Sequence, residues 1–180
     1  MIRIYPFIFI LLWSSAFITT KPIIDNSDPF SALAFRFFFV ALGFYLFSLY
    51  SKQSIFIKQK NLIESVFSGI LFHGFYLGGV FYSISIGMPT SIAALIVTLQ
   101  PILTNALSGP ILGEKVTIKQ WVGVFLGFLG AAMVLGLDVG SEIPLLGVIA
   151  TIVALISITA STIWQKKLSN NLPLPVSNFY

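Results

Sequence analysis

The sequence contains no cysteine and only one histidine. Disulfides and thiolate metal sites are therefore excluded, and we expect neither a metal nor a cofactor. Charged residues are also scarce, at 9% of the 180 positions, whereas soluble domains carry about 25%. Hydrophobic residues make up 57% of the chain. This composition is typical of an integral membrane protein.

The formal net charge is +4, but the basic residues are scattered singly between apolar runs. They form no patch of the kind that binds nucleic acid, so we expect no nucleic-acid partner. We interpret them instead as determinants of orientation in a lipid bilayer.

Six segments are long and apolar enough to cross a bilayer, which takes about 20 residues. Short connections rich in turn residues separate them, such as Asp25 to Pro29, Gly87 to Thr90 and Asp138 to Pro144. The sequence therefore predicts an all-α polytopic helix bundle. The expected helices are Ile4–Thr20, Ser31–Tyr50, Ser65–Ile86, Ser91–Leu112, Ile118–Leu137 and Leu145–Gln165.

Lysine and arginine are unevenly distributed over the two ends of these helices. With the N-terminus in the cytoplasm, the outer side carries only Lys21, while Arg36 lies inside the second helix near its outer end. Cytoplasmic loops of membrane proteins carry an excess of basic residues, so we expect a cytoplasmic N-terminus in an inner or plasma membrane. The cytoplasmic side then holds Arg3, Lys52, Lys58, Lys60, Lys115, Lys119, Lys166 and Lys167.

The run Gly113-Glu114-Lys115 separates two apolar stretches. A charge in the middle of a bilayer costs roughly 2.5 to 3.5 kcal/mol on insertion scales, so this run marks a turn at a membrane surface. The distribution of lysines places the turn on the cytoplasmic side. The simplest role of Glu114 is to cap the following helix, whose positive dipole end lies beside it.

A weak internal repeat appears at an offset near 145 residues. Trp13 to Lys21 aligns with Ile158 to Lys166, and each copy is a run of small and polar residues that ends in lysine. Five helices precede the second copy, and an odd number inverts it in the membrane. Inverted repeats are a common plan of secondary transporters.

Several of these stretches together resemble the EamA family of the drug/metabolite transporter superfamily. They are Trp13-Ser-Ser-Ala-Phe, Ala34-Phe35-Arg36-Phe37, Gln100-Pro101, and the glycine-rich run from Gly109 to Leu135 that contains Gly113-Glu114. The resemblance implies ten helices in two inverted five-helix repeats that move small metabolites by alternating access. Residues 1–137 would form the first repeat and residues 138–180 the first helix of the second. The chain would then be the N-terminal portion of a permease, or a truncated product that does not transport.

The fourth expected helix has one polar side. At about 100° per residue, its polar side chains and Pro101 share an arc of roughly 180°. A proline within a membrane helix frees a carbonyl and bends the helix, which suits the wall of a substrate cavity. The alternative is that these groups only bond neighbouring helices. The arc contains Ser91, Thr98, Gln100, Thr104, Asn105 and Ser108.

The third expected helix carries His73, whose spacing places it on one face with Tyr76. The same face holds Ser65, Gly69, Val80, Ser83 and Gly87. His73 can carry a proton near neutral pH, or it can be a neutral residue that bonds a neighbouring helix.

Arg36 has two interpretations as well. It can attract an anionic group of a substrate, or it can extend to the interface and pair with Asp25 or Asp28. Trp13 can stack on a substrate or mark an interface. On the fifth helix, Gly123, Gly127 and Gly130 form a strip that permits close helix packing.

These observations predict a membrane permease and not an enzyme, because the expected spans lack converging nucleophiles, acids and metal ligands. The alternative is a structural membrane subunit without transport of its own. The expected partners are a small-molecule substrate and the lipid bilayer, with H⁺, a counter-substrate and a second copy of the chain left open. The expected pathway residues are Trp13, Arg36, His73, Tyr76, Thr98, Gln100, Pro101 and Asn105, and Gly113 and Glu114 form the structural turn.

Overall fold

The computed structural model describes residues 4–135, 143–168 and 172–180. These residues form helices and connections, with no strand among them, so the predicted all-α bundle is confirmed. Five helical stretches are long and apolar enough to cross a membrane. Arg3, the expected boundary between residues 137 and 138, and most of the connection from Asp138 to Pro144 lie outside the described residues.

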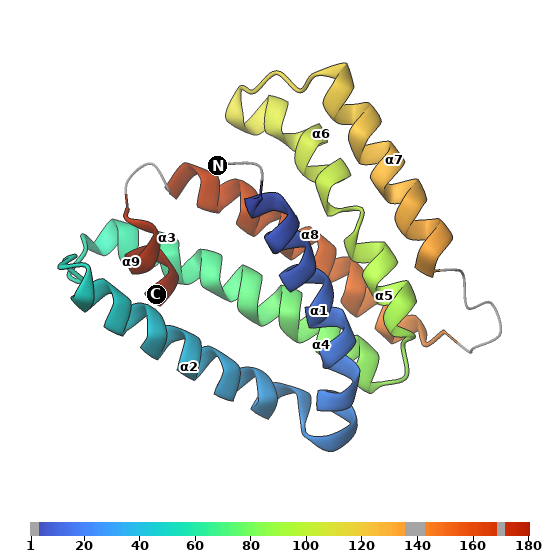
Figure 1. Cartoon of the computed structure of the whole chain (residues 1–180), viewed down its shortest axis with the longest axis horizontal. Coiled ribbons are helices and arrows are strands. Elements are labelled where there is room, and N and C mark those ends of the chain that lie inside the picture. The colour runs from blue at the N-terminus through green and yellow to red at the C-terminus, as the bar shows by residue number, and fades with distance from the viewer. Residues whose placement is uncertain (1–3, 136–142, 169–171) are drawn as a thin grey trace.

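Figure 1 shows α8 (Leu145–Leu168) running between two groups of helices. On one side it packs against a continuous rod made of α3 (Gln59–Gly69), the π-helix η1 (Ile70–Leu77) and α4 (Gly78–Ser85). On the other side it contacts α5 (Thr90–Val97) and α6 (Gln100–Leu112). The first helix of the expected second repeat therefore lies at the centre of the bundle.

The remaining helices surround this centre (Figure 1). Helix α1 (Tyr5–Asn26) contacts α2 (Pro29–Tyr50), α4 and α5. Helix α7 (Ile118–Leu135) packs against α5 and α6, and the short α9 (Leu174–Phe179) lies against α2. Helix α7 is apolar but shorter than the five long candidates over its described residues.

Helices α4 and α8 approach each other closely at Gly79. A Cβ atom at this glycine would lie 2.9 Å from the carbonyl oxygen of Ala150 and 3.2 Å from the Cβ of Ala154. Small residues allow such contacts between membrane helices. The buried core extends along this contact and includes Tyr76, Val80, Ile84, Met88 and Ile158.

The connection between the first two helices is shorter than the predicted loop from Asp25 to Pro29. Helix α1 continues to Asn26, and Pro29 already opens α2. Asp28 caps α2, because its carboxylate accepts a hydrogen bond from the backbone N–H of Ser31 at 2.8 Å. This hydrogen bond lowers the pKa of the Asp28 carboxyl. The predicted boundary missed that an N-cap aspartate and a proline at the first helical position need only two connecting residues.

The third span also begins earlier than predicted. It starts at Gln59 and not at Ser65, because Lys60 and Glu64, which interrupt the apolar pattern, lie within the first helical turns and form an i,i+4 ion pair. Hydropathy alone marked only the apolar part of this helix.

The predicted fourth helix is divided into two. Helix α5 ends at Val97 and α6 begins at Gln100, so Pro101 lies in the first turn of a new helix. A proline is tolerated there, because the N–H that it lacks has no partner within the helix. The hydroxyl of Thr98 donates to the carbonyl oxygen of Leu95 at 2.7 Å and closes the end of α5.

The expected close packing of the glycine strip on α7 is not present within the described part of the chain. Cβ atoms added to Gly123, Gly127 and Gly130 would meet nothing within 4 Å. Helix α7 contacts α5 and α6.

We expect Gly79→Ala to lower the free energy of unfolding by about 1 to 3 kcal/mol, because the added methyl group is forced against the backbone of α8. Gly43→Ala on the exposed side of α2 is the matched control, since its Cβ would meet nothing within 4 Å. Alanine is favoured over glycine in a helix by about 1 kcal/mol, so this control should be neutral or stabilising. Thermal unfolding of both variants in detergent provides the measurement. Equal melting temperatures would contradict the close α4–α8 contact.

Candidate functional site

A cavity of about 200 Å³ lies between α1, α2, η1 and α4. It brings together three of the predicted pathway residues, Trp13, Arg36 and Tyr76. The rings of Trp13 and Tyr76 are nearly parallel, with an angle of 8° between them and centroids 6.5 Å apart. Phe72 meets Tyr76 edge-on at 5.3 Å. We call this cavity the aromatic chamber.

Arg36 is the one charged residue among those that line the aromatic chamber. The two aspartates considered as its partners are engaged elsewhere. Asp25 pairs with Lys21 at 3.3 Å, and Asp28 holds the N-terminus of α2. Within the described residues Arg36 forms no salt bridge, so its guanidinium is a donor for a ligand with an acceptor group.

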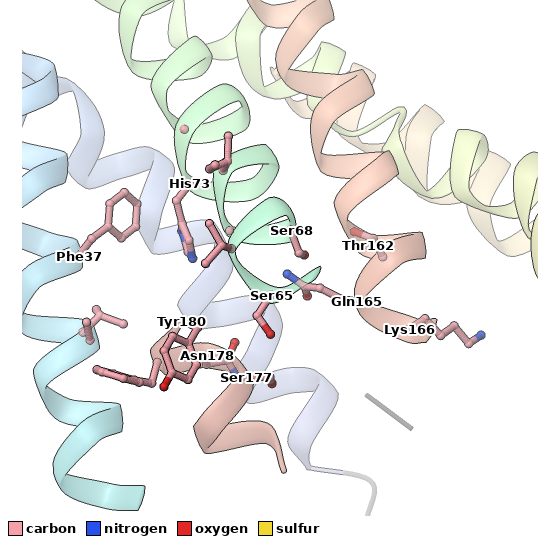
Figure 2. Close-up of a pocket in the computed structure, with 17 residues that line it drawn as sticks. Phe37, Ser65, Ser68, His73, Thr162, Gln165, Lys166, Ser177, Asn178 and Tyr180 are labelled. Carbon is pink, nitrogen blue, oxygen red and sulfur yellow. The ribbon is translucent and has the colours of Figure 1, made fainter. Parts of the chain in front are cut away.

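A larger cavity of about 680 Å³ lies between α2, α3, η1, the end of α8 and α9. His73 lines it, and the centroid of its ring lies 4.3 Å from the ring centroid of Phe37. Figure 2 shows His73 and Ser65 on one side of this space, with Tyr180 opposite them. We call it the polar chamber.

The two chambers lie on different sides of the same helical rod, and the π-helix η1 explains why. An ideal α-helix would place His73 and Tyr76 on one face, as their spacing predicts. A π-helix has i→i+5 hydrogen bonds and more residues per turn. A step of three residues therefore rotates around the helix axis by less than the 300° of an α-helix. Within η1, Tyr76 therefore turns into the aromatic chamber while His73 lines the polar chamber.

Ser65 and Gly69 precede the π-helix and share the polar chamber with His73. This part of the expected face is present in the structure. Val80 and Ser83 follow the π-helix and are buried, and Val80 lines the aromatic chamber. The expected single face is therefore divided at η1.

The four pathway residues predicted on the fourth span, Thr98, Gln100, Pro101 and Asn105, line neither chamber. The side-chain amide of Gln100 donates to the hydroxyls of Thr104 and Thr162, both at 3.2 Å, and so joins α6 to α8. This geometry agrees with the alternative that the polar side of the helix bonds a neighbouring helix.

The predicted role of Glu114 as a cap of the next helix is wrong. Its carboxylate accepts a hydrogen bond from the ammonium group of Lys166 on α8 at 2.7 Å. Gly113 has a φ of +70°, which ends α6 and turns the chain so that Glu114 faces α8. The ion pair joins the turn between α6 and α7 to the C-terminal end of α8.

Helix α7 is capped by Thr117 and Gln120 instead. The hydroxyl and the backbone N–H of Thr117 both donate to Oε1 of Gln120 at 2.8 Å. The backbone N–H of Gln120 in turn points to the threonine hydroxyl at 3.4 Å. This reciprocal arrangement is a capping box, and the Thr-x-x-Gln spacing could have indicated it from the sequence.

The polar residues that the last two helices bring to the polar chamber were not predicted as site residues from the sequence. They include Gln165 on α8, Asn178 on α9 and Tyr180. The hydroxyl of Tyr180 donates to the carbonyl oxygen of Ile55 at 2.8 Å, which holds the C-terminal segment in place. No periodic pattern indicates this position, because α9 is only six residues long.

In the part of the chain that the structure describes, no group of three or more histidine, aspartate or glutamate side chains lies close enough together to hold a metal ion. The two chambers offer apolar surface and hydrogen-bonding side chains of the kind found in small-molecule sites.

Comparison with known proteins gives a family match. The model of the EamA-like transporter family matches residues 3–136. No solved structure matches the chain.

Curated relatives are similar over nearly the whole chain. A "Probable amino-acid metabolite efflux pump" of Salmonella typhimurium is 24% identical over 167 residues, which cover 92% of this chain and 54% of the relative. A protein of the same description from Escherichia coli is 26% identical with the same coverage. The "Uncharacterized transporter YvbV" of Bacillus subtilis is 24% identical over 88% of this chain and 51% of its own length. The chain thus spans about half the length of these relatives.

The ion pair between Glu114 and Lys166 makes a measurable prediction. Their side chains are 42% and 56% exposed, and exposed pairs contribute about 0.2 to 1 kcal/mol. We expect a double-mutant cycle with Glu114→Gln and Lys166→Gln to give a coupling free energy in this range at low salt. The coupling should decrease in about 1 M salt, where charges are screened within about 3 Å.

Unfolding of the four cycle members in detergent measures this coupling. The pair Lys60 and Glu64 on α3 is the control, because its 3.9 Å separation predicts a weaker coupling. Zero coupling between Glu114 and Lys166 at low salt would show that the contact does not persist in solution.

Proposed function

The chain belongs to the EamA-like transporter family, and on this basis we propose that it forms the N-terminal part of a permease that moves a small metabolite by alternating access. Membrane transport of a small metabolite agrees with the names of its relatives and with the five apolar helices.

The aromatic chamber is the observation that carries this proposal. It combines two large aromatic surfaces, Trp13 and Tyr76, with a guanidinium group that has no salt bridge among the described residues. Such a site suits an amphipathic solute that stacks on the rings and directs a carboxylate to Arg36. Ligand sites are mostly apolar with a few placed polar groups, as this chamber is.

Two relatives are named as probable amino-acid metabolite efflux pumps. We therefore propose amino-acid metabolites with an apolar side chain as the substrate class. Their carboxylate would meet Arg36, and their side chain would meet the ring surface of Trp13.

The proposal also includes a cytoplasmic gate. The lysines in the connections after α2 and α6 and at the end of α8 would lie on the cytoplasmic side, with the N-terminus. The contact between Glu114 and Lys166 supports a common side for the α6–α7 turn and the end of α8. In alternating access, the first helix of the second repeat would move against the first repeat, and this ion pair would open and close with it.

Coupling to H⁺ or to a counter-substrate belongs to the same proposal. His73 is the single histidine of the sequence and lines the polar chamber, where it could exchange a proton with water. Thr98, Gln100, Pro101 and Asn105 remain proposed pathway residues for a conformation in which α6 separates from α8. Association into a homodimer likewise remains a proposal.

We expect the complete permease of which this chain would be the N-terminal part, reconstituted in liposomes, to transport amino-acid metabolites such as leucine or phenylalanine. Arg36→Gln should raise the apparent KM roughly 10- to 100-fold, because a charge-assisted hydrogen bond contributes about 1.5 to 3 kcal/mol. Arg36→Lys should retain part of the affinity, since lysine keeps the charge but loses the planar fork. Uptake of radiolabelled solute measures both effects.

Phe39→Leu is the matched control, because Phe39 lies on the exposed side of the same helix, at 64% exposure. Its flux should equal that of the unchanged chain. Folded protein without flux of any amino-acid metabolite, nucleoside, amine or sugar would favour the alternative, a structural subunit that does not transport.

Proton coupling is tested by the pH dependence of the same flux. We expect an inward proton gradient to change the rate in the unchanged chain and to have no effect in His73→Leu. Phe75→Leu provides the control on the same π-helix, since Phe75 is exposed and lines neither chamber. A gradient effect that persists in His73→Leu would assign coupling to another group.

A further inference from the structure

The connection between α2 and α3, residues 51–58, joins two of the candidate membrane spans and belongs to neither (Figure 1). It contains Lys52 and Lys58, and Lys60 follows in the first turn of α3. No aspartate or glutamate occurs from residue 51 to residue 63. Within the described residues, Lys52 and Lys58 form no ion pair. The connection therefore presents positive charge without a counter-charge at the level where two helices leave the bilayer.

The same connection carries an uncovered aromatic ring. Phe56 is 90% exposed, the largest fraction among the large hydrophobic side chains that the structure describes. Its neighbours Ile55 and Ile57 are partly buried, and the carbonyl oxygen of Ile55 accepts a hydrogen bond from the hydroxyl of Tyr180 at 2.8 Å. The connection is thus held against the protein while the ring of Phe56 stays uncovered. Beside a bilayer, such a ring can enter the boundary between headgroups and acyl chains.

The three lysines occupy positions where the local backbone favours other residues. Lys52 has a φ of +53° and closes the C-terminal end of α2, where glycine is the usual residue. Lys58 is the N-cap of α3, but its side chain makes no capping hydrogen bond, and serine, threonine, aspartate or asparagine is preferred there. Cations are also unfavourable beside the positive end of a helix dipole, where Lys58 and Lys60 lie. The stability of α3 therefore does not explain its two lysines.

From these observations we infer that the α2–α3 connection is a binding surface for anionic phospholipid headgroups. Lys52, Lys58 and Lys60 contact the phosphates, and Phe56 enters the acyl-chain boundary beneath them. A free phosphate would satisfy the lysines but would give the ring of Phe56 no apolar contact, so the geometry favours a lipid. The inference depends neither on transport nor on which face of the membrane this connection occupies.

The absence of cysteine from the sequence allows a local measurement. A bimane fluorophore on Ser51→Cys, next to Lys52 and exposed, reports on the lipids around the connection. The labelled chain is placed in phosphatidylcholine nanodiscs that contain a small fraction of spin-labelled phosphatidylglycerol or, in a parallel sample, of spin-labelled phosphatidylcholine. The ratio of the two quenching constants gives the local enrichment of the anionic lipid. We expect an enrichment of at least about fivefold at low salt, which falls towards one in about 1 M salt.

The variant with Lys52→Gly, Lys58→Ser and Lys60→Gln should lower the enrichment at least about fivefold, the equivalent of about 1 kcal/mol for one lysine near an anionic membrane. Phe56→Ser should lower it as well, because the ring no longer holds the connection at the headgroups. The matched control is Lys115→Gln with Lys119→Gln, which removes exposed lysines around the α6–α7 turn and should leave the enrichment unchanged.

Thermal unfolding of the same variants separates lipid binding from a structural role. Lys52→Gly and Lys58→Ser introduce the residues that the backbone favours, so each should melt at the same temperature as the unchanged chain or higher. Lower melting temperatures for both would assign the lysines to helix structure and overturn the inference. An enrichment near one in the unchanged chain, an equal fall in the Lys115 and Lys119 control, or loss of the enrichment in about 10 mM glycerol 3-phosphate would each overturn it too.

Discussion

The close contact of α4 with α8 is the constraint on which the arrangement of the bundle depends. Lipid chains are as apolar as the helices, so membrane helices associate through tight packing and polar contacts. Gly79 allows the backbone of α8 to approach at Ala150. This contact fixes the position of α8, so that residues near its C-terminal end lie beside the polar chamber and the turn after α6. Gln165 reaches the polar chamber, and Lys166 reaches Glu114 on the turn after α6.

Much of the fold could be predicted from the sequence, because bilayer thickness sets the length of each apolar run. The positions of the long helices and the turn at Gly113 follow from hydropathy and charge. The bend expected at Pro101 is present as a full break between Val97 and Gln100. The π-helix at Ile70–Leu77 could not be predicted in this way, because the periodicity of one segment does not indicate where a helix leaves the α-helical pattern. The Thr117–Gln120 capping box was readable and was missed in favour of the nearby charge of Glu114.

The candidate site was predictable only in part. Trp13, Arg36 and Tyr76 were selected separately, on three helices, and the structure gathers them in one chamber. Periodicity placed Ser65 and His73 on one face, and the polar chamber contains both. It failed for His73 and Tyr76, because it assumed an α-helical turn where a π-helical one occurs. Contacts between residues distant in sequence, such as the hydrogen bond from Gln100 to Thr162, can be predicted only when it is known how the helices cross.

The π-helix has a consequence for how this chain is compared with its relatives. One wide turn holds one residue more than the α-helical turn it replaces. A relative with a regular helix at this position would therefore show a gap of one residue opposite Ile70–Leu77. An ungapped alignment would match residues of one chamber with residues that face the other in the relative. When substrate-binding residues are compared between family members, the segments before and after this turn should therefore be aligned separately. Each residue is then matched with one that faces the same chamber.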